Sequence, residues 1–127
     1  MVIRDLEDKD YETLCSWWSV HNFVAPPKSI LPGTGYICDE IAAGYLYLTN
    51  SSICWMEWVV CDPDSEKAKR NAAINGLIDH ICKQARFVGG IIVYTSTNNF
   101  AFAHRIKKLG FRDAQDEKKT NNYMKVL

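Results

Sequence analysis

The most strand-like stretch of the sequence is ICWMEWVVC, which covers Ile53–Cys61 and is followed by Asp62-Pro63. It is nine residues long and rich in tryptophan and valine, two residue types that are enriched in strands. We predict that it forms the central strand of a sheet. The stretch from Asp62 to Ser65 is expected to end it, because proline has no backbone N–H to donate to a neighbouring strand.

A long helix is predicted directly after this strand, from Ser65 to about Arg86. Apolar residues recur there at helical intervals between Ala72 and Ala85. Asp64 or Ser65 is the expected N-cap, because short polar side chains accept hydrogen bonds from the free N–H groups of a first turn.

The remaining elements follow from the same periodicities and from turns marked by glycine, proline and asparagine. They are a strand at 2–4, a helix at 8–20, an irregular linker at 25–33, strands at 35–39 and 43–49 joined by a tight turn at Asp39-Glu40, a strand at 91–96, a helix from Asn99 to Leu109, a strand from Phe111, a turn at 118–121 and a last strand at 122–127. The predicted order is therefore β-α-β-β-β-α-β-α-β-β. It indicates an α/β (α+β) fold, with a mixed central β-sheet flanked by helices, in a single domain over residues 1–127.

Composition excludes several classes of protein. The 127 residues include 15 basic and 15 acidic side chains and are 47% hydrophobic, which argues against a disordered chain and against a strongly basic nucleic-acid binder. The five cysteines contain no CxxC pair and the three histidines lack metal spacing, so neither a disulfide framework nor a metal site is predicted. There is no signal-peptide pattern and no apolar run long enough to span a membrane, so we expect a cytoplasmic protein without a membrane partner.

The zero net charge divides into two opposite halves. Residues 1–64 hold ten acidic and three basic side chains, whereas residues 65–127 hold five acidic and twelve basic ones. Two interpretations remain open: a chance distribution on a solvated surface, or opposite fields that steer oppositely charged ligands.

The start of the helix after Pro63 is a candidate anion-binding site. A helix N-terminus presents unpaired backbone N–H groups and the positive end of its dipole, a combination that binds phosphate. The first turns also carry Lys67, Lys69 and Arg70, with Asn71 beside them. The stretch Ser65–Asn71 could therefore hold an anionic ligand, or it could be an ordinary exposed basic face of a helix.

Two segments of this layout resemble the GNAT superfamily of acyl-CoA N-acyltransferases, and the resemblance covers essentially the whole chain. The first is Val59-Val60-Cys61-Asp62-Pro63 with the long helix after it. The second is Asn99, which precedes a helix that closes in Leu109-Gly110-Phe111. The chain also loosely resembles short GNAT-like sequences carried by tailed bacteriophages.

The resemblance implies an N-acetyltransferase that moves an acetyl group from acetyl-CoA to a primary amine, on either a small molecule or a peptide. It implies that the cofactor is bound by the end of the central strand, by the following loop and helix start, and by the next helix: Val59, Val60, Cys61, Ser65, Lys67, Lys69, Arg70, Asn71 and Asn99. The amine would enter near Trp17, Trp18 and Pro26, and many such proteins form homodimers.

Glu57 is the candidate general base, since the family commonly carries this base on the central strand and Glu57 is the one carboxylate within the stretch 53–61. Burial would raise its pKa and suit it to accept a proton near neutral pH. The alternative is a solvent-facing or hydrogen-bonded strand residue. Trp55 and Trp58 are expected in the core or in a cleft wall rather than stacked on a ligand.

Two positions depart from the family pattern. The family loop reads Arg/Gln-x-x-Gly-x-Gly/Ala, and an ungapped count from Pro63 places Glu66, Lys69 and Asn71 at the arginine and the two glycines. The family often has a tyrosine as general acid where this chain has Ile106. Either basic side chains replace bare N–H groups in an altered loop, or no cofactor binds.

The alternative to an N-acetyltransferase is therefore a catalytically inactive GNAT-fold binding or virion-associated protein. A nucleic-acid module, suggested by Lys107, Lys108, Lys118 and Lys119, lacks any recognised motif.

Overall fold

The computed structural model describes residues 1–114 and 122–127. Its strands are β1 (Ile3–Asp5), β2 (Gly35–Cys38), β3 (Ala42–Leu48), β4 (Ile53–Cys61), β5 (Ile92–Ser96), β6 (Arg112–Asp113) and β7 (Asn122–Val126). Its α-helices are α1 (Tyr11–Val20), α2 (Lys67–Phe87) and α3 (Phe100–Lys108), with short 3-10 helices at Asp8–Asp10 and Lys28–Ile30. This order confirms the predicted sequence of strands and α-helices. The turn predicted at 118–121 lies outside the described residues.

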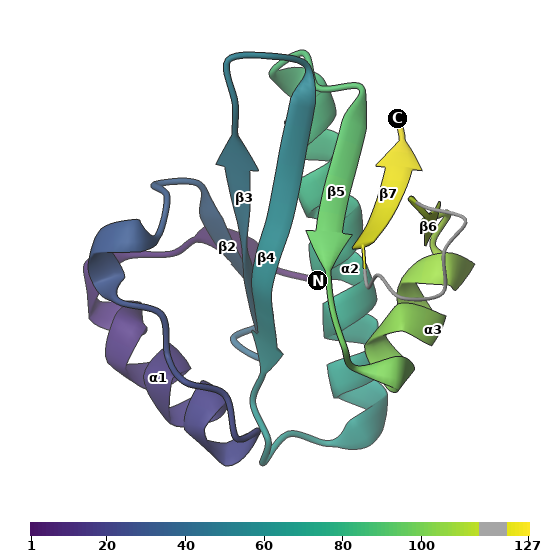
Figure 1. The fold of residues 1–127 in the computed structure, drawn as a ribbon. Helices are drawn as coiled ribbons and strands as arrows, with labels where there is room; N and C mark the ends of the chain where they lie inside the picture. The colour runs from purple at the N-terminus through teal and green to yellow at the C-terminus, as the bar shows by residue number, and fades with distance from the viewer. Residues whose placement is uncertain (115–121) are drawn as a thin grey trace.

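The strands form one mixed sheet in the order β1-β2-β3-β4-β5-β7-β6. Every neighbouring pair is antiparallel except β4 and β5, which run parallel and are joined through α2 (Figure 1). The fold is therefore a mixed α/β sheet flanked by helices, and β4 lies at its centre, as predicted from the ICWMEWVVC stretch.

Two hydrophobic clusters cover the two faces of this sheet. One joins α2 and α3 to the sheet, and α2 contributes Leu77, Ile78 and Ile81 to it, each at most 1% exposed. The other packs Leu14, Trp17 and Trp18 of α1 against the opposite face (Figure 1). The helical spacing of these apolar residues explains why each helix has one buried face. Burying one such side chain contributes about 1.5–3 kcal/mol.

Two helix starts differ from the predictions. The prediction of Asp64 or Ser65 as the N-cap of the long helix was wrong, because α2 begins at Lys67 and its N-cap is Glu66. The polar side chains ahead of it close a turn of their own: Asp62 Oδ1 accepts from the Asp64 N–H at 2.9 Å, and the Ser65 hydroxyl donates to the Asp62 carbonyl at 2.6 Å. The helix predicted at 8–20 begins with a 3-10 turn and becomes α-helical at Tyr11.

The hairpin turn between β2 and β3 is confirmed at Asp39-Glu40. Both residues have positive φ, 54° and 57°, and the Ile41 N–H donates to the Cys38 carbonyl at 2.9 Å. Two left-handed residues in a row are the geometry of the two-residue turns that match the twist of paired strands.

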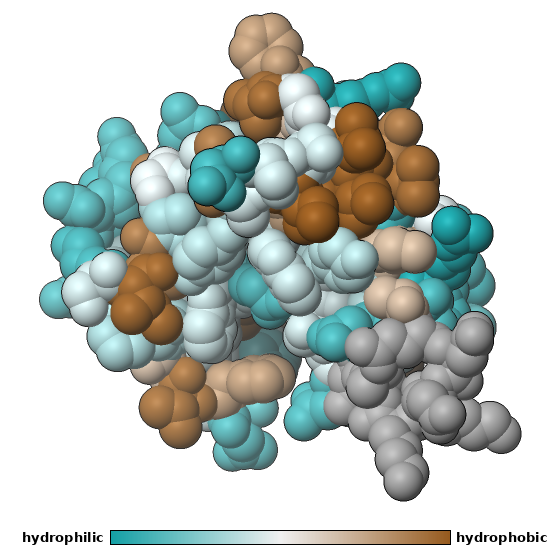
Figure 2. Space-filling view, turned by 45° about the horizontal axis from the view of Figure 1, so that its top comes forward, coloured by the Kyte–Doolittle hydropathy of each residue, from teal (hydrophilic) through white to brown (hydrophobic). Residues whose placement is uncertain are grey.

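Apolar side chains gather on the face of the molecule that Figure 2 views. Phe87, Val88, Ile91 and Val126 are each more than half exposed, and the register pairs the neighbouring Ile92 with both Val126 and Ile53. These residues therefore lie at the end of the sheet where β4 begins. Among the described residues, no helix is both long enough and apolar enough to cross a membrane.

Candidate active site

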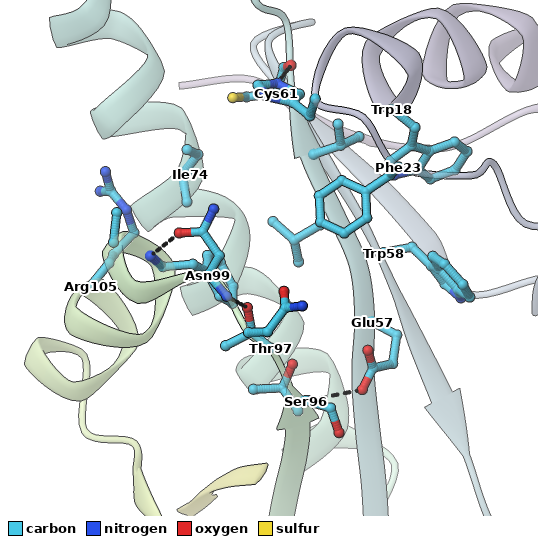
Figure 3. A pocket seen from close by; sticks show the side chains of 17 residues that line it. Trp18, Phe23, Glu57, Trp58, Cys61, Ile74, Ser96, Thr97, Asn99 and Arg105 are labelled. Atoms are coloured by element: carbon cyan, nitrogen blue, oxygen red, sulfur yellow. Dashed lines mark hydrogen bonds between the residues drawn. The ribbon is translucent and has the colours of Figure 1, made fainter. Parts of the chain in front are cut away.

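A cavity of about 600 Å³ lies at the other end of β4, where β4 and β5 diverge. Its lining comes from the end of α1 with the turn after it, the second half of β4, Ile74 of α2, and the segment that leads from β5 into α3 (Figure 3). A cavity of this size is large enough for part of a ligand of drug-like dimensions.

The divergence of the two strands is built into β4. Both strands are fully described, and they pair only over Ile53–Trp55 with Ile92–Tyr94. Further along, the register with β3 shifts so that Trp58 and Val59 lie opposite the single residue Gly44. This is a β-bulge, with Trp58 in the left-handed region at φ 63°. A bulge bends its strand, and beyond Trp55 the edge of β4 that faces β5 is open towards the cavity.

Glu57 lies at the point of divergence and lines the cavity. The backbone N–H of Ser96 donates to its Oε1 at 3.0 Å, across the gap between the strands (Figure 3). Burial raises the pKa of this carboxyl to about 7, and the hydrogen bond from Ser96 opposes the rise. Of the described residues that line the cavity, Glu57 is the one carboxylate. Near neutral pH such a group both accepts and returns a proton readily.

One side of the cavity is formed by Asn99, Phe102 and Arg105, which we call the α3 wall. Asn99 is the N-cap of α3, as predicted, and its Oδ1 accepts from the Phe102 N–H at 2.9 Å. Arg105 reaches across to α2 and donates to the side-chain oxygens of Asn71, at 2.7 Å, and Asn75, at 2.8 Å. The wall therefore brings one guanidinium to the cavity in a fixed position.

The structure brings four of the predicted cofactor residues to the cavity and leaves five outside its lining. Val59, Val60, Cys61 and Asn99 line it, whereas Ser65, Lys67, Lys69, Arg70 and Asn71 do not. Lys67 and Lys69 are exposed, and Arg70 donates to the Ser65 carbonyl at 3.0 Å.

On the side of the cavity opposite the α3 wall, the structure places some of the predicted residues in the lining and others outside it. Trp18, which was predicted near the amine, lines the cavity, as does Trp58, which was predicted in the core or in a cleft wall. Trp17 and Pro26 are buried and do not line it. Ile106 is fully buried in the core, and no tyrosine is among the described residues of the lining.

Sequence reasoning missed His21, Phe23 and Arg105. Phe23 is placed by the end of α1, where Asn22 is left-handed and the Phe23 N–H donates back to the Trp18 carbonyl at 2.9 Å. An asparagine just after a helical pattern is a signal for such a turn. Arg105 has no comparable local signal, because its partners lie more than 25 residues away on α2.

The acidic residues of the first half mostly lie away from this cavity. Arg4 pairs with Asp10 at 2.9 Å and with Glu40 at 2.8 Å, on the β1–β2 side of the molecule. Of the ten acidic side chains in residues 1–64, Glu57 alone lines the cavity.

Several solved structures are similar to this chain over their whole length, and three of them serve as examples. A Mycobacterium tuberculosis protein in complex with CoA matches 100% of this chain and 99% of its own, with a TM-score of 0.77 and 11% identity. A putative acyl-CoA N-acyltransferase from Klebsiella pneumoniae matches 99% of this chain and 97% of its own, with a TM-score of 0.76 and 16% identity. A GNAT-family acetyltransferase from Staphylococcus aureus matches 99% and 98%, with a TM-score of 0.75 and 12% identity.

These similarities establish that the chain has the GNAT fold, the fold of the acyl-CoA N-acyltransferases. No family model and no curated protein matches the sequence.

Proposed function

We propose that this chain is an N-acetyltransferase that moves an acetyl group from acetyl-CoA to a primary amine. The observation that carries the proposal is Glu57: a half-buried carboxyl with a pKa of about 7 at the mouth of a cavity that opens between β4 and β5 of a GNAT fold. A perturbed carboxyl in a cleft is a candidate acid–base group.

Glu57 acts as the general base in this proposal. The carboxylate takes a proton from the incoming ammonium, and the neutral amine attacks the thioester carbonyl. The new C–N bond forms, the C–S bond breaks, and the CoA thiolate leaves with the electron pair of the broken bond. The nitrogen loses its second proton to solvent as the intermediate collapses, and the thiolate takes up a proton from solvent. A positioned base of this kind typically contributes 10²- to 10⁴-fold in rate.

The open edge of β4 provides the electrostatic part of the mechanism. Beyond Trp55, β4 has no paired partner in β5, so the backbone groups of Val59–Cys61 that point away from β3 are available to a ligand carbonyl. Backbone N–H donors aimed at a developing oxyanion contribute several kcal/mol of transition-state stabilisation.

In this proposal the anionic end of acetyl-CoA binds beside the α3 wall, without the glycines of the family loop. Lys69 and Asn71 stand where the family has glycines, and the Asn71 side chain is bonded to Arg105. In this proposal the guanidinium of Arg105 and the first N–H groups of α2 bind the pyrophosphate together. Ser65, Lys67, Lys69 and Arg70 then act around that site rather than inside the cavity.

Calorimetric titration with acetyl-CoA is the direct test of the proposed function. We expect binding with a Kd in the micromolar range, and release of free CoA thiol when a panel of primary amines is added. A flat titration at high protein concentration, with no thiol released, would contradict the proposal.

A second function, a GNAT-fold binding protein without catalysis, is favoured by two observations. The acid position is occupied by Ile106, which is 0% exposed and packs in the core. The loop ahead of α2 has no glycine to bring its backbone close to a pyrophosphate. In that case acetyl-CoA is not turned over with any amine, and Glu57→Gln behaves like the unmodified chain in its biological role.

A further inference from the structure

Three aromatic side chains line the cavity on the side opposite the α3 wall. They are Trp18, Phe23 and Trp58, and we call them the aromatic wall (Figure 3). The Trp18 and Trp58 rings meet edge to face, with centroids 6.3 Å apart and an interplanar angle of 74°. Such a wall offers a flat apolar ligand a large contact area.

Hydrogen bonds hold the aromatic wall in place. The Trp58 indole N–H donates to the Tyr47 hydroxyl at 2.9 Å, and that hydroxyl donates to the Ile30 carbonyl at 2.9 Å. Phe23 is fixed by the left-handed turn at Asn22 although half of its surface is exposed. A half-exposed phenylalanine held at a cavity rim, with no core to pack into, fits a ligand contact better than a structural role.

The Trp18 side chain supports the wall through its contact with Trp58. It is 2% exposed and lines the cavity, and its Nε1–H has no hydrogen-bond partner. Among the described residues it is the one buried side-chain nitrogen or oxygen in this state. Because the Nε1 atom is itself buried, an oxygen in the cavity does not reach it, and the exposed ring surface of the wall belongs to Phe23 and Trp58.

The charges of the cavity limit the ligand further. Glu57 is the one carboxylate among the described lining residues, and Arg105 lies on the far wall. One carboxylate matches one ammonium group. A polyamine would bring further cations next to apolar rings and a guanidinium, where they would find no partner.

We propose that the acceptor is a primary monoamine with a flat aromatic body. The body lies against Phe23 and Trp58, and the amine is directed to Glu57. This rests on the proposed acetyl transfer, in which the amine nitrogen bonds the acetyl carbon, the C–S bond breaks, and the amine proton passes to Glu57.

Direct amine binding, followed by NMR titration, tests the acceptor class without requiring turnover. Phenylalanine amide and phenethylamine have the amine and the ring, alanine amide lacks the ring, and spermidine is a polycation. We expect each of the two ring-bearing amines to bind about tenfold tighter than alanine amide or spermidine. Equal or tighter binding of spermidine or alanine amide would overturn the proposal.

Two variants test the ring contact. Phe23→Ala should weaken the binding of both ring-bearing amines about tenfold. Phe100→Ala, which changes an 87% exposed phenylalanine outside the cavity lining, serves as the matched control. Equal losses of affinity in the two variants would overturn the assigned contact.

The acceptor class and the acetyl transfer fail in different measurements. Acetylation of spermidine in preference to phenylalanine amide would overturn the acceptor class and leave the transferase standing. Selective binding of phenylalanine amide by a protein that does not bind acetyl-CoA would support the ligand class of the cavity and overturn the transferase.

Discussion

The two walls of the cavity differ in what they leave free for a ligand. On the α3 wall the polar side chains are held in place by other residues: Asn99 caps its helix, and Arg105 is bonded to Asn71 and Asn75 with some of its N–H donors. On the aromatic wall the exposed ring surfaces of Phe23 and Trp58 remain available. A wall of backbone groups and one fixed cation suits a single invariant ligand, whereas a wall of side chains can discriminate between ligands. We infer from this difference that the proposed cofactor binds at the first wall and the proposed acceptor at the second.

Glu57→Gln is expected to have the largest effect, because both walls serve a reaction only if a base lies between them. The amide can still accept the hydrogen bond from Ser96 but cannot take a proton. We expect kcat/KM to fall about 10²- to 10³-fold, with the Kd for acetyl-CoA nearly unchanged. Steady-state kinetics with calorimetry measures both quantities.

The pH profile of the unmodified chain is part of the same prediction. The carboxylate is the active form, so kcat/KM should rise with pH, bend at about 7 and level off above it. The bend should be absent from Glu57→Gln. A profile that keeps its inflection in the variant would assign the base to another group.

Much of this frame could be predicted from the sequence because it depends on local patterns. The apolar run at 53–61 identified the central strand, and Asn99 identified the start of α3, since its side chain caps the helix that follows it. Asp62 and Ser65 misled the prediction of the α2 start for a local reason as well: their side chains bond within their own turn and are not available as caps.

The cavity itself could be predicted only in part, because it depends on contacts between distant segments. The left-handed conformation of Trp58 belongs to a bulge opposite Gly44, and no run of valine and tryptophan indicates such a bulge. The guanidinium of Arg105 is held in position by its hydrogen bond to Asn71, 34 residues earlier in the chain. Only the packing of α3 beside α2 brings these two side chains together.

Arg105→Ala sharpens the assignment of the α3 wall. It removes the one guanidinium that lines the cavity within the described residues. We expect the Kd for acetyl-CoA to rise about 10- to 100-fold, because hydrogen bonds from a charged group to phosphate are strong. Lys108→Ala, an exposed cation on the same helix, is the control. An equal loss of acetyl-CoA affinity in both variants would mean that Arg105 acts only through general electrostatic attraction.

Tyr47→Phe tests whether the aromatic wall depends on its hydrogen bonds. The substitution leaves the Trp58 indole N–H without its partner and frees the Ile30 carbonyl. We expect the free energy of unfolding to fall by about 1 kcal/mol, as for a typical hydrogen bond. The KM for the amine should rise while the Kd for acetyl-CoA stays the same. Changes of similar size in both constants would mean that the two walls are not independent.

Asn22→Ala has the smallest expected effect and tests the turn that positions Phe23 in the aromatic wall. Asn22 is exposed and left-handed at φ 61°, and its own N–H donates to the Ser19 carbonyl at 3.1 Å. Alanine tolerates this conformation less well than asparagine, so chemical denaturation should show a loss of about 0.5–1 kcal/mol. Asn22→Gly removes the steric cost and should remain close to the unmodified chain. Because the turn positions Phe23, alanine but not glycine should also raise the KM for an aromatic amine. If glycine raises the KM for the amine as much as alanine does, the asparagine side chain, rather than the backbone conformation, positions Phe23.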